Sequence, residues 1–330
     1  FAATHRINLA RDDMKRISLV AGSALLYLAA CITPTEREAV PASDFETYPG
    51  YTGNYEGFNL IIDDRFDQFD VTLWRSGDGA VGGESMCRFQ PQGVRVEDGI
   101  LKLIVDEADV PPGYSNDHQQ EKGPYNYVCG EVRTLDDRLF HYGRIEARMK
   151  APNRETASGY ISSLFTYRFD KDPGSETPDS TEWEEIDVEL EGGRPDKFQA
   201  NLIYGKDTWE WWRTRVYGAW EDKIEVGPVD DWRVFAIEWL PDQIRWYVDG
   251  ELVKTLTTSD IDCDPECIPP QENPTPIPNN PTTIFMNFWI PVDDVQDYFG
   301  GNKVRNQYPM MAEYDWFRYY AWEGAPETGN

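Results

Sequence analysis

The segment over residues 183–190 reads Trp183-Glu184-Glu185-Ile186-Asp187-Val188-Glu189-Leu190. Its polarity alternates with a period of two, which is typical of a β-strand whose successive side chains point to opposite faces. The three aliphatic side chains then face the space between two sheets. The opposite face carries the indole of Trp183 and the carboxylates of Glu185, Asp187 and Glu189. This strand therefore predicts a sandwich of sheets with an acidic outer face.

Three carboxylates on one strand face can be explained as the solvated surface of an acidic protein. Two observations favour a functional explanation instead. Like charges along one face repel each other, so stability alone gives no reason to place them there. Trp183 on the same face offers a flat apolar surface on which a sugar ring can stack.

The spacing of the two outer glutamates suggests a particular chemistry. Glu185 and Glu189 lie four residues apart, which separates their Cα atoms by about 13 Å in an extended strand. Side chains that lean towards each other leave carboxyl groups about 5–6 Å apart, a separation typical of retaining glycoside hydrolysis. That chemistry needs one ionised nucleophile and one protonated acid. Asp187 between them supplies the like charge and hydrogen bonding that can hold two carboxyl pKa values apart.

The rest of the chain from about residue 56 also reads as strands and turns. Alternating runs recur along it, and the run that ends before Asp249-Gly250 carries a hairpin signal. No segment after residue 56 shows a long apolar period of 3.6 residues. The pattern predicts an all-β sandwich or barrel. The runs lie at residues 143–149, 197–204, 233–239, 244–248, 283–289 and 314–320.

The first 31 residues have the organisation of an export signal. Residues 1–13 precede the expected start at Met14 and are read as upstream sequence. A positive n-region at Met14 leads into a short apolar run, Ile17–Leu28, and a small-residue site that ends at Cys31. The apolar run is shorter than the roughly 20 residues that a membrane-spanning helix needs. Cys31 directly after Leu-Ala-Ala resembles a bacterial lipobox, which predicts a lipoprotein signal peptide over 14–31 with Cys31 lipidated.

The residues after Cys31 predict where the protein resides. Ile32 stands where an Asp would favour inner-membrane retention, so the resemblance to lipoproteins favours the outer membrane and the cell surface. Residues 32–55 contain Pro34, Pro41 and Pro49 with little periodicity and are predicted to be a tether. The catalytic domain is expected over residues 56–326.

The composition limits the partners. The chain has 330 residues with 59 Asp+Glu against 31 Lys+Arg, a formal charge of −28, and 14% aromatic residues. Such an aromatic content argues against disorder. The negative charge disfavours nucleic acid and sulfated polymers and is compatible with a neutral sugar chain. We expect no membrane contact beyond the lipid anchor, and a monomer.

The cysteine count is consistent with export. Five Cys less the lipidated one leave four, an even number, which predicts two disulfides. Three pairings of these four are possible. A local loop between Cys263 and Cys267 would leave Cys87 with Cys129.

Together, these motifs resemble glycoside hydrolase family 16, and most closely the bacterial β-1,3-1,4-glucanases, or lichenases. Glu185-Ile186-Asp187-Val188-Glu189, preceded by Trp183, is similar to the catalytic signature of that family. The resemblance covers most of residues 60–321. Further matching stretches are Gly143–Lys150, Ser162–Tyr167, Ile244–Gly250, Met286–Trp289 and Tyr314–Trp316.

The resemblance implies a fold and a set of roles. The fold is a β-jelly-roll sandwich whose concave sheet carries the substrate cleft. Glu185 would be the nucleophile, Glu189 the general acid/base and Asp187 the assisting acid. The Cys87–Cys129 pair falls where lichenases have a disulfide. No cofactor is required for the chemistry, and Asp315 matches a position that binds a structural calcium in the family.

Other cleft positions transfer from the same resemblance. The implied substrate-binding residues are Trp183, Glu131, Arg133, Phe165, Tyr167, Asn201, Asn287 and Trp289. The chain departs from the lichenase pattern at Ala80-Val81 and at Ile203, where a substrate-facing Tyr is expected. Three segments are expanded, over residues 172–181, 209–220 and 263–281. These departures leave the exact glucan open.

The sequence therefore predicts an endo-acting retaining β-glucan hydrolase, either a β-1,3-1,4-glucanase or a related β-1,3-glucanase. Xyloglucan hydrolysis or transglycosylation within the same family is one alternative. A non-catalytic, lectin-like jelly roll is another, but a decayed site would be expected to lose at least one of the three carboxylates.

Overall fold

The computed structural model describes residues 47–80, 85–110, 113–114, 121–122, 125–171, 180–208, 216–260 and 277–326. The export signal with Cys31, residues 32–46 of the expected tether, and Cys263 and Cys267 lie outside the described residues. Most of the three expanded segments does too. Within the described part of the chain, no helix is long and apolar enough to cross a membrane.

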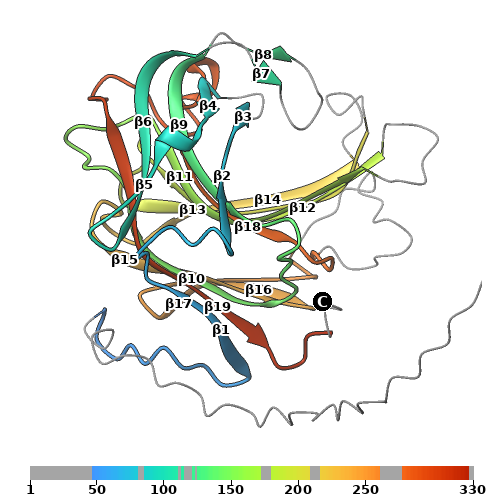
Figure 1. Cartoon of the computed structure of the whole chain (residues 1–330). Helices are drawn as coiled ribbons and strands as arrows, with labels where there is room; N and C mark the ends of the chain where they lie inside the picture. Colours follow the sequence, from blue (N-terminus) through green and yellow to red (C-terminus); the bar gives the residue numbers. More distant parts are fainter. Residues whose placement is uncertain are drawn as a thin grey trace, which may run out of the picture. The chain divides into compact units, whose positions relative to one another are not determined.

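Two sheets pack face to face, and the one that contains the acidic strand is here named the front sheet (Figure 1). All of its neighbouring strands are antiparallel, and its strands are visibly curved in Figure 1. In hydrogen-bonding order the strands are β2 (Trp74–Ser76), β9 (Tyr125–Thr134), β18 (Thr283–Trp289), β11 (Ile161–Lys171), β12 (Ser180–Glu191), β13 (Lys197–Thr208) and β14 (Val216–Glu225).

The second sheet, here named the back sheet, is also antiparallel. Its strands in order are β5 (Val94–Glu97), β6 (Ile100–Val110), β19 (Met310–Trp322), β10 (Gly143–Lys150), β15 (Arg233–Leu240), β16 (Gln243–Val248) and β17 (Glu251–Thr257). β1 (Phe58–Asp64) pairs with the C-terminal half of β19. The sequence-predicted runs all lie in these two sheets, and the structure extends several of them, β19 most of all.

The two sheets are joined by β6, which pairs with β19 at its start and with β9 at its end. Next to this junction β4 (Cys87–Phe89) runs parallel to β9 and pairs with β3 (Gly79–Ala80). The Cys87–Cys129 disulfide is present there, with 5.7 Å between the Cα atoms, as the resemblance implied. Short elements complete the described part, namely β7 (Gly113–Tyr114), β8 (Glu121–Lys122), and single 3₁₀ turns at Pro91–Gly93 and Asp293–Val295.

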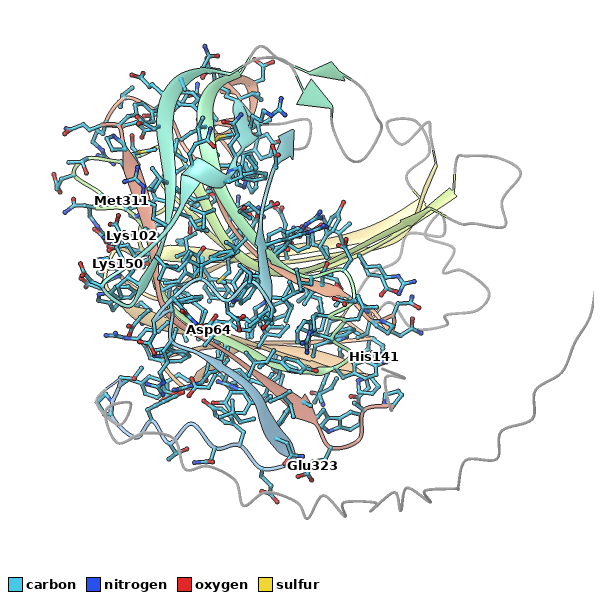
Figure 2. All side chains as sticks on the ribbon, in the orientation of Figure 1. Asp64, Lys102, His141, Lys150, Met311 and Glu323 are labelled. Carbon is cyan, nitrogen blue, oxygen red and sulfur yellow. A yellow bond between two sulfur atoms is a disulfide. The ribbon has the colours of Figure 1, made fainter. Side chains whose placement is uncertain are left out.

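Apolar side chains fill the layer between the sheets (Figure 2). Ile186, Val188 and Leu190 of β12 are fully buried there, as the alternation predicted. The Trp246 indole of β16 crosses this layer and donates a hydrogen bond from Nε1 to the backbone oxygen of Asp187, at 2.9 Å. The predicted all-β sandwich is confirmed, and the outer face of β12 is left for polar side chains.

Residues 47–57, here named the N-terminal strap, pack on the outer face of the back sheet. Tyr51 is 2% exposed, and its hydroxyl donates to Glu146 Oε2 at 3.2 Å. Tyr55 donates to Glu146 Oε1 at 2.7 Å. The packed chain therefore includes the strap, which precedes the domain start expected at residue 56. The burial of tyrosine rings against β10 and β19 explains the earlier start, because such contacts leave no trace in strand periodicity.

Candidate active site

Strand register assembles the predicted residues in rows across the outer face of the front sheet, here named the front face. One row passes through Asp187. Phe165 on β11 and Asn201 on β13 lie directly opposite it on either side. Phe165 in turn lies opposite Phe285, and Phe285 opposite Arg133 of β9. Because opposed residues of antiparallel strands share a face, these side chains belong to one surface.

A second row passes through Glu189. Ser163 of β11 and Gln199 of β13 flank it. The row continues through Asn287 of β18 to Glu131 of β9. Two members of the predicted sugar-binding set, Glu131 of β9 and Asn287 of β18, are thus aligned with a predicted catalytic residue.

Glu185 defines a third row, with Tyr167 on β11 opposite it and Ile203 on β13. Trp289 lies one row beyond Glu189, opposite Ile161, which is itself opposite Glu191. Trp183 belongs to β12, and its side chain lies outside the described residues. Of the eight predicted substrate-binding residues, the register therefore aligns six with the three acids and places Trp289 in the adjacent row.

Aromatic rings line the floor beside the acids. Phe165 stacks on Phe285 with 5.0 Å between ring centroids, and Tyr167 meets the edge of Phe285 at 5.5 Å. The Arg133 guanidinium lies 5.5 Å from the Phe285 centroid. Phe165 is only 8% exposed, so it acts as a packed floor, and the more exposed Tyr167 is better placed to contact a sugar ring.

Asp187 is the most deeply buried of the three acids, with 2% of its surface exposed. Burial raises the pKa of its carboxyl well above the ordinary value, and the nearby charges of Glu185 and Glu189 raise it further. Asn201, directly opposite on β13, acts in the other direction. Both carboxyl oxygens of Asp187 are buried without a hydrogen-bond partner among the described residues. A carboxyl in this environment tends to hold a proton, and a protonated carboxyl is able to donate to an ionised carboxylate beside it.

Glu189 is 9% exposed and also favours its protonated form. Burial raises the pKa of its carboxyl, and the charges of Glu185, Glu191 and Glu221 raise it further. Gln199 donates a hydrogen bond from Nε2 to Glu189 Oε2 at 3.0 Å and so fixes the carboxyl group. A fixed carboxyl whose pKa is raised is suited to act as a general acid near neutral pH.

The neighbouring Glu184 has a different task. It points to the other side of β12, where Asn280 donates from its backbone N at 3.0 Å and from Nδ2 at 2.8 Å. This contact ties the segment after residue 277 to the sandwich. The adjacent Glu184 and Glu185 therefore have separate roles because strand geometry sends them to opposite faces.

Asp315 lies on β19 of the back sheet and forms an ion pair with Arg148. Calcium requires six to eight oxygen ligands. Within the described part of the chain, no group of three or more His, Cys, Asp or Glu side chains could hold a metal ion. Calcium also takes backbone carbonyl oxygens and waters as ligands, so the structural calcium at Asp315 stays a prediction.

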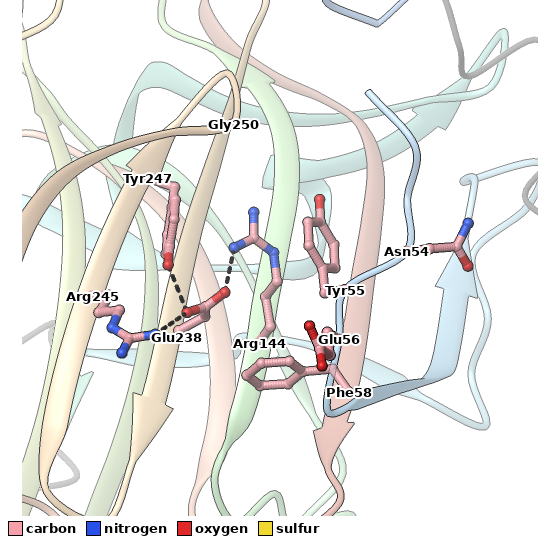
Figure 3. A pocket seen from close by; sticks show the side chains of 9 residues that line it. All are labelled: Asn54, Tyr55, Glu56, Phe58, Arg144, Glu238, Arg245, Tyr247 and Gly250. Atoms are coloured by element: carbon pink, nitrogen blue, oxygen red, sulfur yellow. Dashed lines mark hydrogen bonds and ion pairs between the residues drawn. The ribbon is translucent and has the colours of Figure 1, made fainter. Parts of the chain in front are cut away.

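Among the described residues, a pocket lies on the outer face of the back sheet, here named the back face, between that sheet and the strap (Figure 3). Its central Arg144 pairs with Glu238 at 2.9 Å and with Glu146 at 2.9 Å, and its guanidinium lies 3.9 Å from the centre of the Tyr55 ring. Arg245 also pairs with Glu238 at 3.4 Å, so two arginines and two glutamates balance each other within the fold, which indicates a structural cluster.

Sequence reasoning missed three residues next to Glu189, namely Gln199, Glu191 and Lys223. Gln199 could have been found, because it shares the face of Asn201 two residues away in an alternating run. Glu191 extends the acidic face of β12 by the same rule. Lys223 carries no such signal, since its place depends on how β14 pairs with β13.

An all-β sandwich with paired glutamates beside a buried aspartate, on a face floored by aromatic rings, has the architecture of a polysaccharide-cleaving glycoside hydrolase. A family model described as glycosyl hydrolases family 16 matches residues 82–308. The chain therefore belongs to glycoside hydrolase family 16 and is a glycoside hydrolase.

Individual relatives agree with this assignment. A β-glucanase of Acetivibrio thermocellus is 29% identical over 315 residues, which cover 94% of this chain and 73% of the relative. The solved β-glucanase of Bacillus licheniformis superposes with a TM-score of 0.55 at 25% identity, over 79% of this chain and 97% of that one. A solved β-1,3-1,4-glucanase (lichenase) derived from a mouse hindgut metagenome gives 0.55 at 26% identity, over 79% and 99%. The jelly-roll sandwich and the likeness to lichenases are confirmed.

Proposed function

We propose that this β-glucan hydrolase is endo-acting and retaining, and that it cleaves mixed-linkage β-1,3-1,4-glucan or a related β-1,3-glucan. The observation that carries the proposal is the acidic face of β12, where Glu185 and Glu189 flank the buried Asp187. The raised pKa of Glu189 supports its assignment as the acid, and the greater exposure of Glu185 supports its assignment as the ionised nucleophile.

The reaction follows in two displacements. In the first, a carboxylate oxygen of Glu185 attacks the anomeric carbon while Glu189 gives its proton to the departing glycosidic oxygen. In this mechanism the protonated Asp187 donates to Glu185 and stabilises that carboxylate until it attacks. In the second, Glu189 takes a proton from water, and the oxygen of that water displaces Glu185 from the anomeric carbon. Two inversions retain the β configuration.

Replacing the nucleophile tests the proposal directly. Glu185→Ala should stop hydrolysis but leave glycan binding, because the aromatic floor and the polar rows remain. Azide should then attack an activated β-glycoside in a single displacement and give the α-glycosyl azide. Glu189→Ala should instead give the β azide, because the covalent intermediate on Glu185 still forms. Inverted α products from the wild-type enzyme in proton NMR would refute both role assignments.

The choice of substrate rests on charge and on relatives. With a formal charge of −28, the chain is better matched to a neutral glucan than to a sulfated galactan. A panel of lichenan, laminarin, xyloglucan and carrageenan with product analysis by mass spectrometry separates the alternatives. With a defined oligosaccharide as substrate, products longer than that oligosaccharide would indicate transglycosylation. Binding without any product would indicate the lectin-like alternative.

We further propose that the enzyme is a monomer exported and anchored to the outer membrane through lipidated Cys31. Ile32 after the cysteine supports the outer membrane as its destination. Cys31→Ser should release the protein from membrane pellets and remove a lipid-sized mass increment. Wild-type protein that is wholly soluble in the medium with an unmodified Cys31 would rule the anchor out.

A further inference from the structure

We propose that Glu191 and Lys223 act as a positioning pair that sets the protonation of Glu189, and so the alkaline limit of activity. The inference rests on the proposed role of Glu189 as general acid/base. Neither residue needs to touch the sugar for this task, because both act through the charge that they place beside Glu189.

Glu191 is held next to the acid/base by the strand itself. It follows Glu189 by two residues on β12, so both side chains leave the same face. It is only 2% exposed and forms ion pairs with Arg194 and with Lys223, whose Nζ lies 3.6 Å from Glu191 Oε1. Its two cationic partners hold this carboxylate in place, and its charge acts on the neighbouring Glu189.

Lys223 is fixed from several sides. It lies on β14 opposite Gln199, and Gln199 lies opposite Glu189 and donates to it. The ammonium of Lys223 also donates to the backbone oxygen of Tyr298 at 2.7 Å. A flexible lysine with these contacts is confined to the row of the acid/base, where its charge opposes that of Glu191.

The other groups that face Glu189 complete the electrostatic environment. On its own strand these are Glu185 and Asp187, and from β14 Glu221 adds a further negative charge. The side chains opposite Glu189 on β11 and β13 are the neutral Ser163 and Gln199. The charge of Lys223 lowers the pKa of Glu189, whereas the charges of Glu185, Glu191 and Glu221 raise it.

The two members of the pair should therefore shift the activity profile in opposite directions. In a retaining enzyme the alkaline limb of kcat/KM against pH reports the loss of the acid's proton. Glu191→Gln removes a negative charge, so Glu189 should lose its proton more easily and the limb should move to lower pH. Lys223→Met removes a positive charge, so the limb should move to higher pH. Lys223→Arg keeps the charge and should retain the wild-type limb.

Matched controls come from the opposite outer face of the sandwich. Lys150 and Glu313 form an ion pair of 2.6 Å with side-chain exposures of 29% and 24%, and Lys150 is labelled in Figure 2. Lys150→Met and Glu313→Gln make the same charge changes far from β12 and should leave both limbs unchanged. All variants are measured on the glucan that the wild-type enzyme cleaves fastest, after thermal unfolding has shown that each is folded.

Opposite shifts in the two variants support the pair. Unchanged limbs, or shifts of both variants in the same direction, overturn it while the wild-type enzyme remains active. If Glu191→Gln does not fold, the comparison of Lys223→Met with Lys223→Arg decides in the same way. Failure of the proposed function is distinct, because then the wild-type enzyme yields no β-configured product or Glu189→Ala retains full activity on polysaccharide.

Discussion

Asp187 differs from its two neighbours on β12 in how completely it is removed from water. Its carboxyl is 2% exposed, and burial is the largest cause of its raised pKa, followed by the charges of Glu185 and Glu189. A carboxyl that holds its proton can donate to an ionised neighbour, which an ionised carboxyl cannot do. The chemistry at Glu185 therefore depends on a residue whose burial lowers the stability of the folded protein once its carboxyl is ionised.

The substitution Asp187→Asn tests this effect on the stability of the folded protein. An Asp whose pKa is raised in the folded state stabilises the protein at acid pH, below its unfolded-state pKa. That contribution is lost as the pH rises through the folded-state pKa. The variant lacks this titration, so its melting temperature should fall less than that of the wild type between acid and neutral pH. Its kcat should drop by roughly 10²-fold, because an electrostatic contribution to the transition state is removed.

Two measurements check the result. Thermal unfolding across the pH range reports the stability difference, and proton NMR of the products should still show retention. Asp222→Asn is the control, since Asp222 pairs with Lys254 and is 43% exposed. A variant with wild-type kcat, or a pH dependence of stability equal to that of the wild type, would contradict the assigned role of Asp187.

At the scale of elements, the front face depends on strands that are far apart in the sequence. β9 supplies Glu131 and Arg133, and these follow Cys129 directly. The disulfide to Cys87 attaches the middle of this strand to β4 and is fully buried. The polar residues of β9 are therefore positioned by a covalent link as well as by hydrogen bonds to β18 and β2.

Removing this link should weaken both the fold and the substrate contacts. The paired substitution Cys87→Ala with Cys129→Ala opens a link between residues 42 positions apart. The free energy of unfolding should fall by about 2–4 kcal/mol, mainly because the unfolded chain regains conformational freedom. KM should rise more than kcat falls, since β12 keeps its own contacts. Urea titration and steady-state kinetics measure the two effects, and an unchanged unfolding midpoint would contradict the prediction.

At the scale of the whole described unit, the sandwich has two outer faces with separate tasks. The front face carries the acids, and the back face is covered by the N-terminal strap. Tyr51 and Tyr55 of the strap both donate to Glu146, which is fully buried beside Arg144 and Arg318. These charges are kept from water by tyrosine rings, so the strap is part of the folded unit.

Truncation separates the strap from the residues before it. A chain that begins at residue 47 should keep wild-type stability, whereas one that begins at Phe58 exposes the charges beside Glu146. The second truncation should lose roughly 3 kcal/mol or more of unfolding free energy, because buried ion pairs lose their partners and cover. Below its melting temperature its kcat/KM should stay close to that of the wild type, since the acids lie on the other face. Equal stability of the two truncated chains in urea titration would show that the strap is dispensable.

The alternation of residues 183–190 predicted the buried aliphatic row and the three acids of the outer face, and the recurring alternating runs after residue 56 predicted the sandwich. This succeeds because the side-chain period of a strand is a local property of the backbone. The family signature then extended the prediction to the Cys87–Cys129 link and to residues on β9, β11, β13 and β18. The strap escaped this reasoning, because Tyr51 and Tyr55 act through contacts with a strand some ninety or more residues away.

The tertiary structure alone decided what surrounds each acid. Glu189 and Lys223 share a row only because β12, β13 and β14 pair in one register, and a shift by one residue would turn Lys223 to the other side. Burial likewise follows from how two sheets close on each other. It is burial, together with charges brought in from other strands, that raises the pKa values of Asp187 and Glu189. Residue types and their spacing are encoded along the chain, whereas the electrostatic energy of a carboxyl depends on distances that exist only after the sheets have packed.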